Sequence, residues 1–336
     1  MNTPILSRET GPKPSLGSDT PATYAMYSRI LVPLDGSPLA EKVLPYARVL
    51  AKGFGARVEL LNVFSPAPEG LADHAHGRYP HQIDANLRAE GLDYLHRVTP
   101  SIVCAEVEVS CTVDAGDPDS WIVSVAEKEP DTLIAMSTHG RSGAARLMLG
   151  SVTDRVLHST SAPVLVLRPR DGATPVSEAE LNHVIVPLDG SPLAEQVLPH
   201  VVSLAKALDL TVTLLRVTTF HQNGPLVNYL AKIGEKLGRA GLSSVNSRTI
   251  GDHPPETIVT VARETPHSMV AMTTHGRSGI RRFMLGSVTD HVVRHCGEPV
   301  LVIRAAAGVG EWGSEGEFAK ASHTLGQPGP WERELP

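Results

Sequence analysis

Short apolar runs alternate with longer stretches of helical periodicity through most of the chain. In the first half the apolar runs predict five strands, over Arg29–Leu34, Arg57–Phe64, Ala105–Val113, Thr132–Met136 and Val164–Arg168. The stretches between them, with apolar residues three and four apart, predict helices over Ser37–Phe54, Ile83–Val98, Ser120–Lys128 and Ser151–Ser159. Strands that alternate with helices indicate an α/β fold, with an open, Rossmann-like parallel sheet covered by helices on both faces.

The second half of the chain repeats the first. VPLDGSPLAE at residues 32–41 returns unchanged at 186–195, THGRSG at 138–143 returns at 274–279, and MLGSVTD at 148–154 returns at 284–290. Each half closes on an apolar strand after a proline, PVLVLR from Pro163 and PVLVIR from Pro299. Three blocks in the same order predict two copies of one domain.

Segments without hydrophobic periodicity divide the chain. Residues 1–25 are rich in Pro, Gly, Ser and Thr, and residues 305–336 are rich in Gly and Glu, so we expect a disordered arm and a disordered tail. Between them we expect one domain over 26–170, a linker over 171–182 and a second domain over 183–304. A chain of 336 residues accommodates two domains of ordinary size.

Composition narrows the class of protein. A hydrophobic content of 41% suffices for a core in each copy. A net charge of −6 with interspersed charges, and only 4% aromatic residues, argue against a partner nucleic acid. Three cysteines without CxxC spacing argue against a disulfide framework and a zinc site. Neither a transmembrane-length apolar run nor a signal peptide is visible, so we expect a cytoplasmic protein without a membrane partner.

The carboxyl ends of two strands in each copy carry the candidate chemistry. The first strand ends in Pro-Leu-Asp-Gly, with Asp35 or Asp189, and the fourth leads through a glycine-containing segment into a helix that opens with Gly-Ser. Right-handed crossovers bring both ends to the edge of the sheet where open α/β folds bind ligands. An aspartate accepts hydrogen bonds from an adenine amine or a ribose hydroxyl, and a helix opened by glycine favours phosphate. We expect the two aspartates to contact the ligand, and Ser37 and Ser191 to cap the helices that follow.

This pattern resembles the universal stress protein family in its tandem two-domain form. The family signature is Gly, two residues, Gly, nine residues, and then Gly followed by Ser or Thr. The matching residues are Gly140, Gly150 and Ser151 in the first copy and Gly276, Gly286 and Ser287 in the second. The resemblance covers both repeats and implies an adenine nucleotide alpha hydrolase-like fold, with ATP as the ligand and Mg²⁺ as an optional companion. It implies an adenine-nucleotide-binding stress-response or signalling module without strong catalytic turnover.

The resemblance also implies a nucleotide-binding set in each copy, with adenine and ribose near the early aspartate and phosphates on the glycine loop. In the first copy this set is Pro33, Asp35, Met136, Ser137, His139, Gly140, Arg141, Gly150, Ser151, Val152 and Thr153. In the second copy it is Pro187, Asp189, Met272, Thr273, His275, Gly276, Arg277, Gly286, Ser287, Val288 and Thr289. No catalytic residue and no metal ligand is assigned.

One position departs from the signature in both copies. The first signature glycine is replaced by Ser137 in one copy and Thr273 in the other, and a side chain there is expected to crowd the ribose or the first phosphate. This departure keeps a nucleotide-free dimerisation module as one alternative. An ATP-hydrolysing enzyme of the same fold is the other, although the chain has no GxxxxGK[ST] loop and no evident carboxylate cluster for Mg²⁺.

Three further features carry expectations. The last strands, Val164–Leu167 and Val300–Ile303, present unpaired edges, so we expect them to join the copies as an intramolecular pseudo-dimer, with a homodimer of chains left open. The segment Pro66–Pro100 is longer than its counterpart in the second copy and predicts a lid over the first site. HAHGRYPH, residues 74–81, gathers three histidines, but no pattern of Asp, Glu or Cys completes a metal site.

Overall fold

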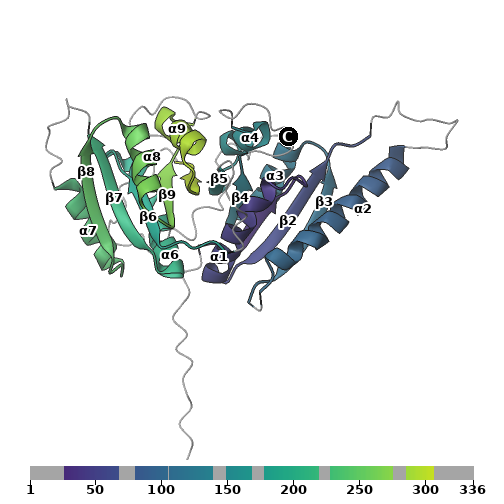
Figure 1. Cartoon of the computed structure of the whole chain (residues 1–336), viewed down its shortest axis with the longest axis horizontal. Coiled ribbons are helices and arrows are strands. Elements are labelled where there is room, and N and C mark those ends of the chain that lie inside the picture. The colour runs from purple at the N-terminus through teal and green to yellow at the C-terminus, as the bar shows by residue number, and fades with distance from the viewer. Residues whose placement is uncertain are drawn as a thin grey trace, which may run out of the picture.

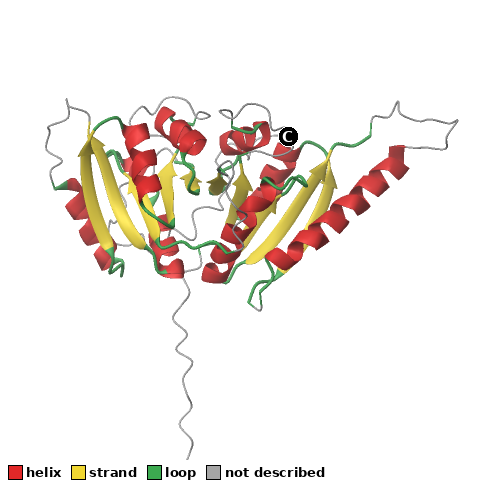
Figure 2. Ribbon diagram, viewed as in Figure 1, coloured by secondary structure: helices red, strands yellow, loops and turns green. Residues whose placement is uncertain are grey.

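The computed structural model describes residues 26–67, 80–104, 106–138, 149–168, 178–218, 228–274 and 285–305. Within these ranges two α/β copies form one molecule around a ten-stranded sheet (Figure 1; Figure 2). The arm expected over 1–25, all but the first residue of the tail expected over 305–336, and most of the linker expected over 171–182 lie outside the described residues.

Each copy contributes five parallel strands in doubly wound order. Copy one has the order β3-β2-β1-β4-β5, made of β1 (Arg29–Pro33), β2 (Arg57–Phe64), β3 (Val109–Ala115), β4 (Thr132–Ser137) and β5 (Val164–Leu167). Copy two mirrors it as β10-β9-β6-β7-β8, made of β6 (His183–Pro187), β7 (Thr211–Thr218), β8 (Val245–Gly251), β9 (Ser268–Thr273) and β10 (Val300–Ile303). The first strand of each copy therefore lies beside the fourth, at the point where the winding reverses direction and where such sheets bind ligands.

The last strands of the two copies join the sheet in its middle. β5 and β10 run antiparallel, with Val300 opposite Val166, Leu301 opposite Leu165 and Val302 opposite Val164. The expected pairing of these edges within one chain is confirmed. The pairing satisfies the backbone groups of two short apolar strands that would otherwise offer open edges.

Helices cover both faces of this sheet (Figure 2). On one face lie α1 (Leu44–Phe54), α2 (Pro80–Val98), α6 (Leu198–Leu208) and α7 (Tyr229–Arg239), and on the other lie α3 (Pro118–Glu127), α4 (Ser151–Ser159), α8 (Pro254–Glu264) and α9 (Ser287–His295). Each face has its own apolar core, and each core includes buried residues of both copies. Shared apolar cores therefore hold the two copies together, in addition to the pairing of β5 with β10.

Two of the expected elements are wrong in their bounds. The single helix expected over Ser37–Phe54 is a short 3₁₀ turn, η1 (Ala40–Val43), followed by α1. Pro45 near the start of α1 lacks the N–H that a continuous helix would need. In copy two α5 (Pro192–Glu195) and α6 are separated in the same way, and Pro199 takes the place of Pro45.

The third strand of copy one also begins later than the expected Ala105–Val113. The chain turns beforehand, with the Val107 amide donating to the Cys104 carbonyl at 3.1 Å, and pairing with β2 runs from Val109 opposite Val58 to Ala115 opposite Phe64. The alternation of side chains that suggested a strand extends into this turn, where no neighbouring strand is available to pair with it. A second short turn, η3 (Thr99–Ser101), follows α2.

Candidate functional site

The turn after the first strand has the same hydrogen bonds in both copies. Asp35 Oδ1 accepts from the Ser37 amide at 2.9 Å, and Ser37 Oγ accepts from the Ala40 amide at 3.1 Å. Gly36 between them has φ 85°, a left-handed conformation that glycine adopts without strain. The expected capping by serine is confirmed for Ser191, the N-cap of α5, whereas the N-cap of η1 is Leu39 and Ser37 accepts from the amide of the first residue of that turn. The aspartate instead fixes the turn, which orients its carboxylate at the strand edge.

Copy two repeats these distances. Asp189 Oδ1 accepts from the Ser191 amide at 2.9 Å, Ser191 Oγ accepts from the Ala194 amide at 3.1 Å, and Gly190 also has φ 85°. Both aspartates are only half buried, so their carboxylates remain accessible at the sheet edge.

The opposite side of the candidate site in copy one is the start of α4. The Gly150 amide donates to the Thr138 carbonyl at 2.7 Å, which ties the start of the helix to the end of β4. Thr153, buried in the first turn, adds a second tie by donating from Oγ1 to the Ser137 carbonyl at 3.0 Å. Gly150 occupies the N-cap, and no side chain caps the helix there. The side chain of Ser151 is exposed, and the first N–H groups of α4 have no partner within the helix itself.

The start of α9 has the same construction. The Gly286 amide donates to the Thr274 carbonyl at 2.6 Å, and Thr289 Oγ1 donates to the Thr273 carbonyl at 2.8 Å. Gly286 is the N-cap without a side-chain cap, and Ser287 is exposed. Each copy therefore presents a helix N-terminus, with its partial positive charge, at the carboxyl edge of its sheet.

The structure brings most of the expected residues together in each copy. β1 pairs with β4 and β6 with β9, both in parallel, so the strand ends that carry Asp35 and Ser137, or Asp189 and Thr273, lie at one edge. Of the expected nucleotide-binding residues, the ones on described segments are Pro33, Asp35, Met136, Ser137, Gly150, Ser151, Val152, Thr153, Pro187, Asp189, Met272, Thr273, Gly286, Ser287, Val288 and Thr289. The others, His139, Gly140, Arg141, His275, Gly276 and Arg277, lie outside the described residues.

The side chain that replaces the first signature glycine in copy one turns toward the sheet. Ser137 Oγ donates to the Leu167 carbonyl of β5 at 3.3 Å, and the residue is 8% exposed. Thr273 in copy two is buried to the same degree, at 7% exposed. The Ser137 hydroxyl is thus engaged by the neighbouring strand, which weakens the argument that it crowds a ligand.

Two tyrosines that the sequence reasoning did not select lie beside the aspartate turns. Burial, followed by the negative charges of Glu41 and Asp35, raises the pKa of Tyr94 on α2. Burial, followed by Glu195 and Asp189, likewise raises the pKa of Tyr229 on α7. The sequence signal shared by the two tyrosines is a Tyr-Leu pair in the helix before the third strand of each copy. Because α2 has 19 residues and α7 has 11, the two pairs do not stand at matching positions of their helices.

The segment expected to be a lid is described only in part. α2 begins at Pro80, before the expected Ile83, and residues 68–79 lie outside the described residues. Asp84 accepts from the Ala67 amide at 2.9 Å, and Arg88 of α2 donates to the Val113 carbonyl at the end of β3. These bonds hold the first half of α2 against the end of the outer strands. Its role as a lid stays a prediction.

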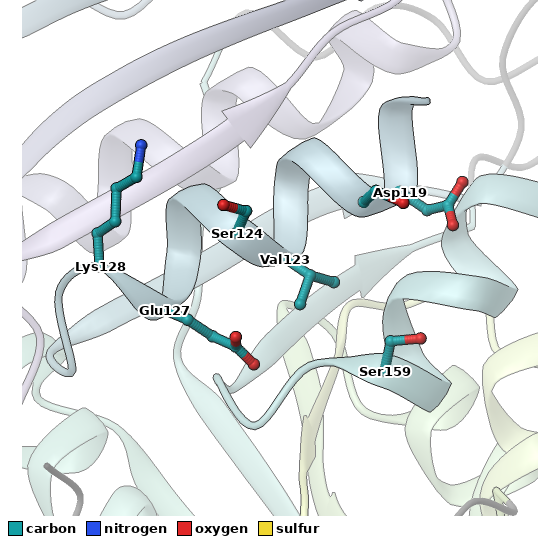
Figure 3. A pocket seen from close by; sticks show the side chains of 7 residues that line it. Asp119, Val123, Ser124, Glu127, Lys128 and Ser159 are labelled. Carbon is teal, nitrogen blue, oxygen red and sulfur yellow. The ribbon is translucent and has the colours of Figure 1, made fainter. Parts of the chain in front are cut away.

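An open hollow of about 480 Å³ lies elsewhere, between α3 and α4 (Figure 3). Its walls are mostly polar and charged, and they are formed by Asp119, Ser120, Val123, Ser124, Glu127, Lys128 and Ser159. None of these belongs to the expected nucleotide set. The hollow therefore adds nothing to the candidate site at the sheet edge.

Comparison with known proteins agrees with this architecture. The model of the Universal stress protein family matches residues 26–168 and again 180–304. Universal stress protein MJ0531 of Methanocaldococcus jannaschii is 34% identical over 144 residues, which cover 43% of this chain and 83% of that protein. Universal stress protein Slr1230 of Synechocystis is 24% identical over 304 residues, which cover 82% of this chain and 99% of that protein.

A solved structure extends the likeness to the tandem arrangement. The crystal structure of a universal stress protein from Archaeoglobus fulgidus superposes with a TM-score of 0.64 at 23% identity, covering 84% of this chain and 99% of that one. In the parts of the chain that the structure describes, no helix is long and apolar enough to cross a membrane. The chain belongs to the universal stress protein family, and it carries two copies of the family's domain in tandem.

Proposed function

We propose that the chain is an adenine-nucleotide-binding module of stress response or signalling, with ATP as the ligand, and with a site in each copy. One observation carries the proposal. In both copies a glycine-capped helix starts at the carboxyl edge of the sheet, beside an aspartate that is held by its own turn. The start of the helix suits phosphate, and the aspartate suits ribose hydroxyls or an adenine amine. Both lie at the same edge of the sheet.

Each part of the site has its own task in this proposal. The first-turn residues Ser151 and Val152, or Ser287 and Val288, would meet the phosphates through backbone N–H groups, aided by a helix dipole equivalent to about half a positive charge. Asp35 or Asp189 would accept hydrogen bonds at the other end of the nucleotide. We assign no residue of this site as a metal ligand, so Mg²⁺ would be carried in by the phosphates of the nucleotide.

Turnover is proposed to be slow or absent. Hydrolysis requires a residue that orients water and a group that stabilises charge on the transferred phosphoryl. The side chains at the described part of the site are Asp, Ser, Thr and apolar residues, and both aspartates already accept from a backbone amide of their own turn. A binding module is thus better supported than the alternative of an ATP-hydrolysing enzyme.

Calorimetric titration with ATP tests the proposal directly. The variants Gly150→Val, Gly286→Val and their double combination add bulk where the phosphates would approach the backbone. Because φ at these glycines is −55° and −59°, valine imposes little backbone strain. Each single variant should lose binding at its own copy, and the double variant should lose both. Gly238→Ala, in an open position of α7, is the matched control and should bind as the wild type.

Two further measurements separate the alternatives. Mass spectrometry of the purified protein should detect a retained adenine nucleotide, whereas a nucleotide-free dimerisation module should carry none. A phosphate-release assay should show little or no turnover, whereas an enzyme should release phosphate steadily. The absence of both heat and thermal stabilisation with adenine nucleotides at millimolar concentration would overturn the proposal.

A further inference from the structure

Helix α9 of copy two carries two histidines on one side that its counterpart α4 lacks. His291 and His295 are four residues apart, a spacing that places side chains one above the other on a helix. Their rings are stacked, with centroids 4.1 Å apart and planes at 23°. At the same positions of the repeat, α4 has Arg155 and Ser159. This pair of imidazoles is therefore present on α9 and missing from the matching helix α4.

The hydrogen bond of the second ring determines which nitrogen can bind a ligand. His295 Nδ1 lies 2.8 Å from the His291 carbonyl oxygen. A carbonyl oxygen only accepts, so Nδ1 must carry the proton, and in the neutral ring Nε2 holds the lone pair. His295 is exposed, and His291 is half buried. Metal-binding histidines are commonly oriented in this way, with the second ring nitrogen donating to a backbone carbonyl.

The charges nearby do not oppose a cation. Arg294 stands between the two histidines in the sequence, but its Nε donates to both carboxylate oxygens of Asp290 at 2.8 Å. Its Nη2 also lies 3.6 Å from Asp154 Oδ1 of α4, across the junction of the copies. The positive charge of Arg294 is thus offset by two carboxylates.

We propose that His291 and His295 form a site for a divalent transition metal ion, of which Cu²⁺ binds tightest and Ni²⁺ or Zn²⁺ more weakly. The lone pairs of stacked rings lie side by side, so binding requires one ring to rotate out of the stack until both lone pairs point at the ion. Imidazole nitrogen is a preferred ligand of these three ions, and their affinities follow this chemistry. Among the described residues no group of three or more His, Cys, Asp and Glu could hold a metal. The described residues therefore supply these two imidazoles as the protein ligands of the proposed site. It is independent of nucleotide binding, since neither histidine belongs to the candidate nucleotide set.

Titration of the full chain with Cu²⁺ tests this site. The matched variant is His291→Arg with His295→Ser, which gives α9 the residues that α4 has at the same positions. Because the chain has 15 histidines, the readout is the difference between proteins. The double variant should bind one Cu²⁺ fewer in calorimetry, or bind it at least about tenfold more weakly, since losing even an outer partner of a ligand costs that much. The electron paramagnetic resonance signal of a two-imidazole Cu²⁺ centre should disappear with it.

A transplant provides the reverse test. Arg155→His with Ser159→His builds the same pair on α4 and should add one Cu²⁺ equivalent to the wild-type stoichiometry. Thermal melting without metal checks that each variant is folded. Equal Cu²⁺ affinity and stoichiometry in the wild type and the double variant would overturn the proposal. So would a result in which only one of the single variants, His291→Arg or His295→Ser, changes binding, because two ligands must act together in a chelate.

Discussion

The first strand of copy one begins with an arginine where the first strand of copy two begins with a histidine. Arg29 is 2% exposed, and its guanidinium donates to Glu59 at 2.9 Å, to Thr132 Oγ1 at 2.9 Å and to the Val125 carbonyl at 2.6 Å. The strand register aligns Arg29 with His183, and the position of Glu59 is taken by Thr213.

In contrast, the site-building turns hardly differ between the copies. The Asp-Gly-Ser turns have the same hydrogen-bond lengths, and both glycine-capped helices are tied to their strands by the same two bonds. A buried ion network lies beneath the sheet edge in copy one, and a histidine and a threonine occupy the matching positions in copy two. The geometry at the edge therefore depends on the local turns and the strand order, and the interior beneath can be built in two ways.

Separating the copies should have the largest effect. A chain ended after residue 170 exposes the edge of β5 and cuts both apolar cores, which are shared between the copies. We expect this half to self-associate through β5 or to precipitate. Sedimentation velocity measures the outcome. A well-folded, cleanly monomeric first half would show that each copy is stable without its partner.

Removing the buried arginine is the next largest change. Arg29→Met leaves Glu59, whose side chain is 15% exposed, without its cation, which costs about 3–5 kcal/mol in the free energy of unfolding. His183→Met at the matched position of copy two breaks no buried ion pair and should cost about 1 kcal/mol or less. Urea denaturation compares the two variants. Equal losses would mean that the ion network around Arg29 contributes no more to stability than His183 does at the matching position.

A buried histidine at the junction makes stability depend on pH. His200 Nδ1 lies 2.6 Å from the hydroxyl of Tyr27 in the other copy, and burial lowers the pKa of His200 to about 4. The pKa in the unfolded chain is about 6.5. Between these values the unfolded state binds more protons, so stability is fully present above pH 6.5 and falls as the pH drops toward 4.

The expected slope from this one group is at most about 1.4 kcal/mol per pH unit. His200→Gln should lose that part of the slope, because glutamine does not titrate. His96→Gln, at an exposed position of α2, is the control and should keep it. Denaturation curves from pH 7 to 4.5 measure the difference. A slope unchanged by His200→Gln would rule out His200 as its origin.

The contact between α1 and α6 is a further difference between the copies, and we expect its effect on stability to be the smallest of these. Gly53 of α1 aligns with Ala207 of α6, and a Cβ at Gly53 would lie 2.2 Å from Leu208 Cδ2 and 3.0 Å from the Ala207 carbonyl oxygen. Gly53→Ala gains helix propensity but overpacks the contact, whereas Gly238→Ala in open space only gains propensity. We expect the two variants to differ in stability by about 1–3 kcal/mol. Thermal unfolding measures this, and equal stabilities would show that Leu208 moves aside freely.

Local signals in the chain were sufficient for the layout of the site. The blocks shared by the two halves predicted the repeat. The alternating strand and helix patterns predicted a parallel sheet that has the aspartate turn and the glycine-capped helix at one edge. The break after η1 was predictable as well, since Pro45 stands where a continuous helix needs an N–H. The pairing of β5 with β10 followed from the cost of leaving apolar edges open, although its register did not.

Other features were out of reach because they depend on residues far apart in the chain. Tyr27 and His200 form a hydrogen bond although they are 173 residues apart in the sequence, and no sequence pattern around either residue indicates the contact. Tyr94 and Tyr229 reach matching places from different points along helices of unequal length. The burial of Arg29 required Glu59, Glu129 and Thr132 to converge from other strands and loops.

The sequence by itself thus determined the two copies, their α/β layers and which residues stand at each sheet edge, because periodicity, turns and helix starts are set by neighbouring residues. Only the tertiary structure decided which charges are buried, which copy carries them and how the two cores merge. Those outcomes depend on packing and on the loss of water around particular groups, which are properties of the assembled interior rather than of any one segment.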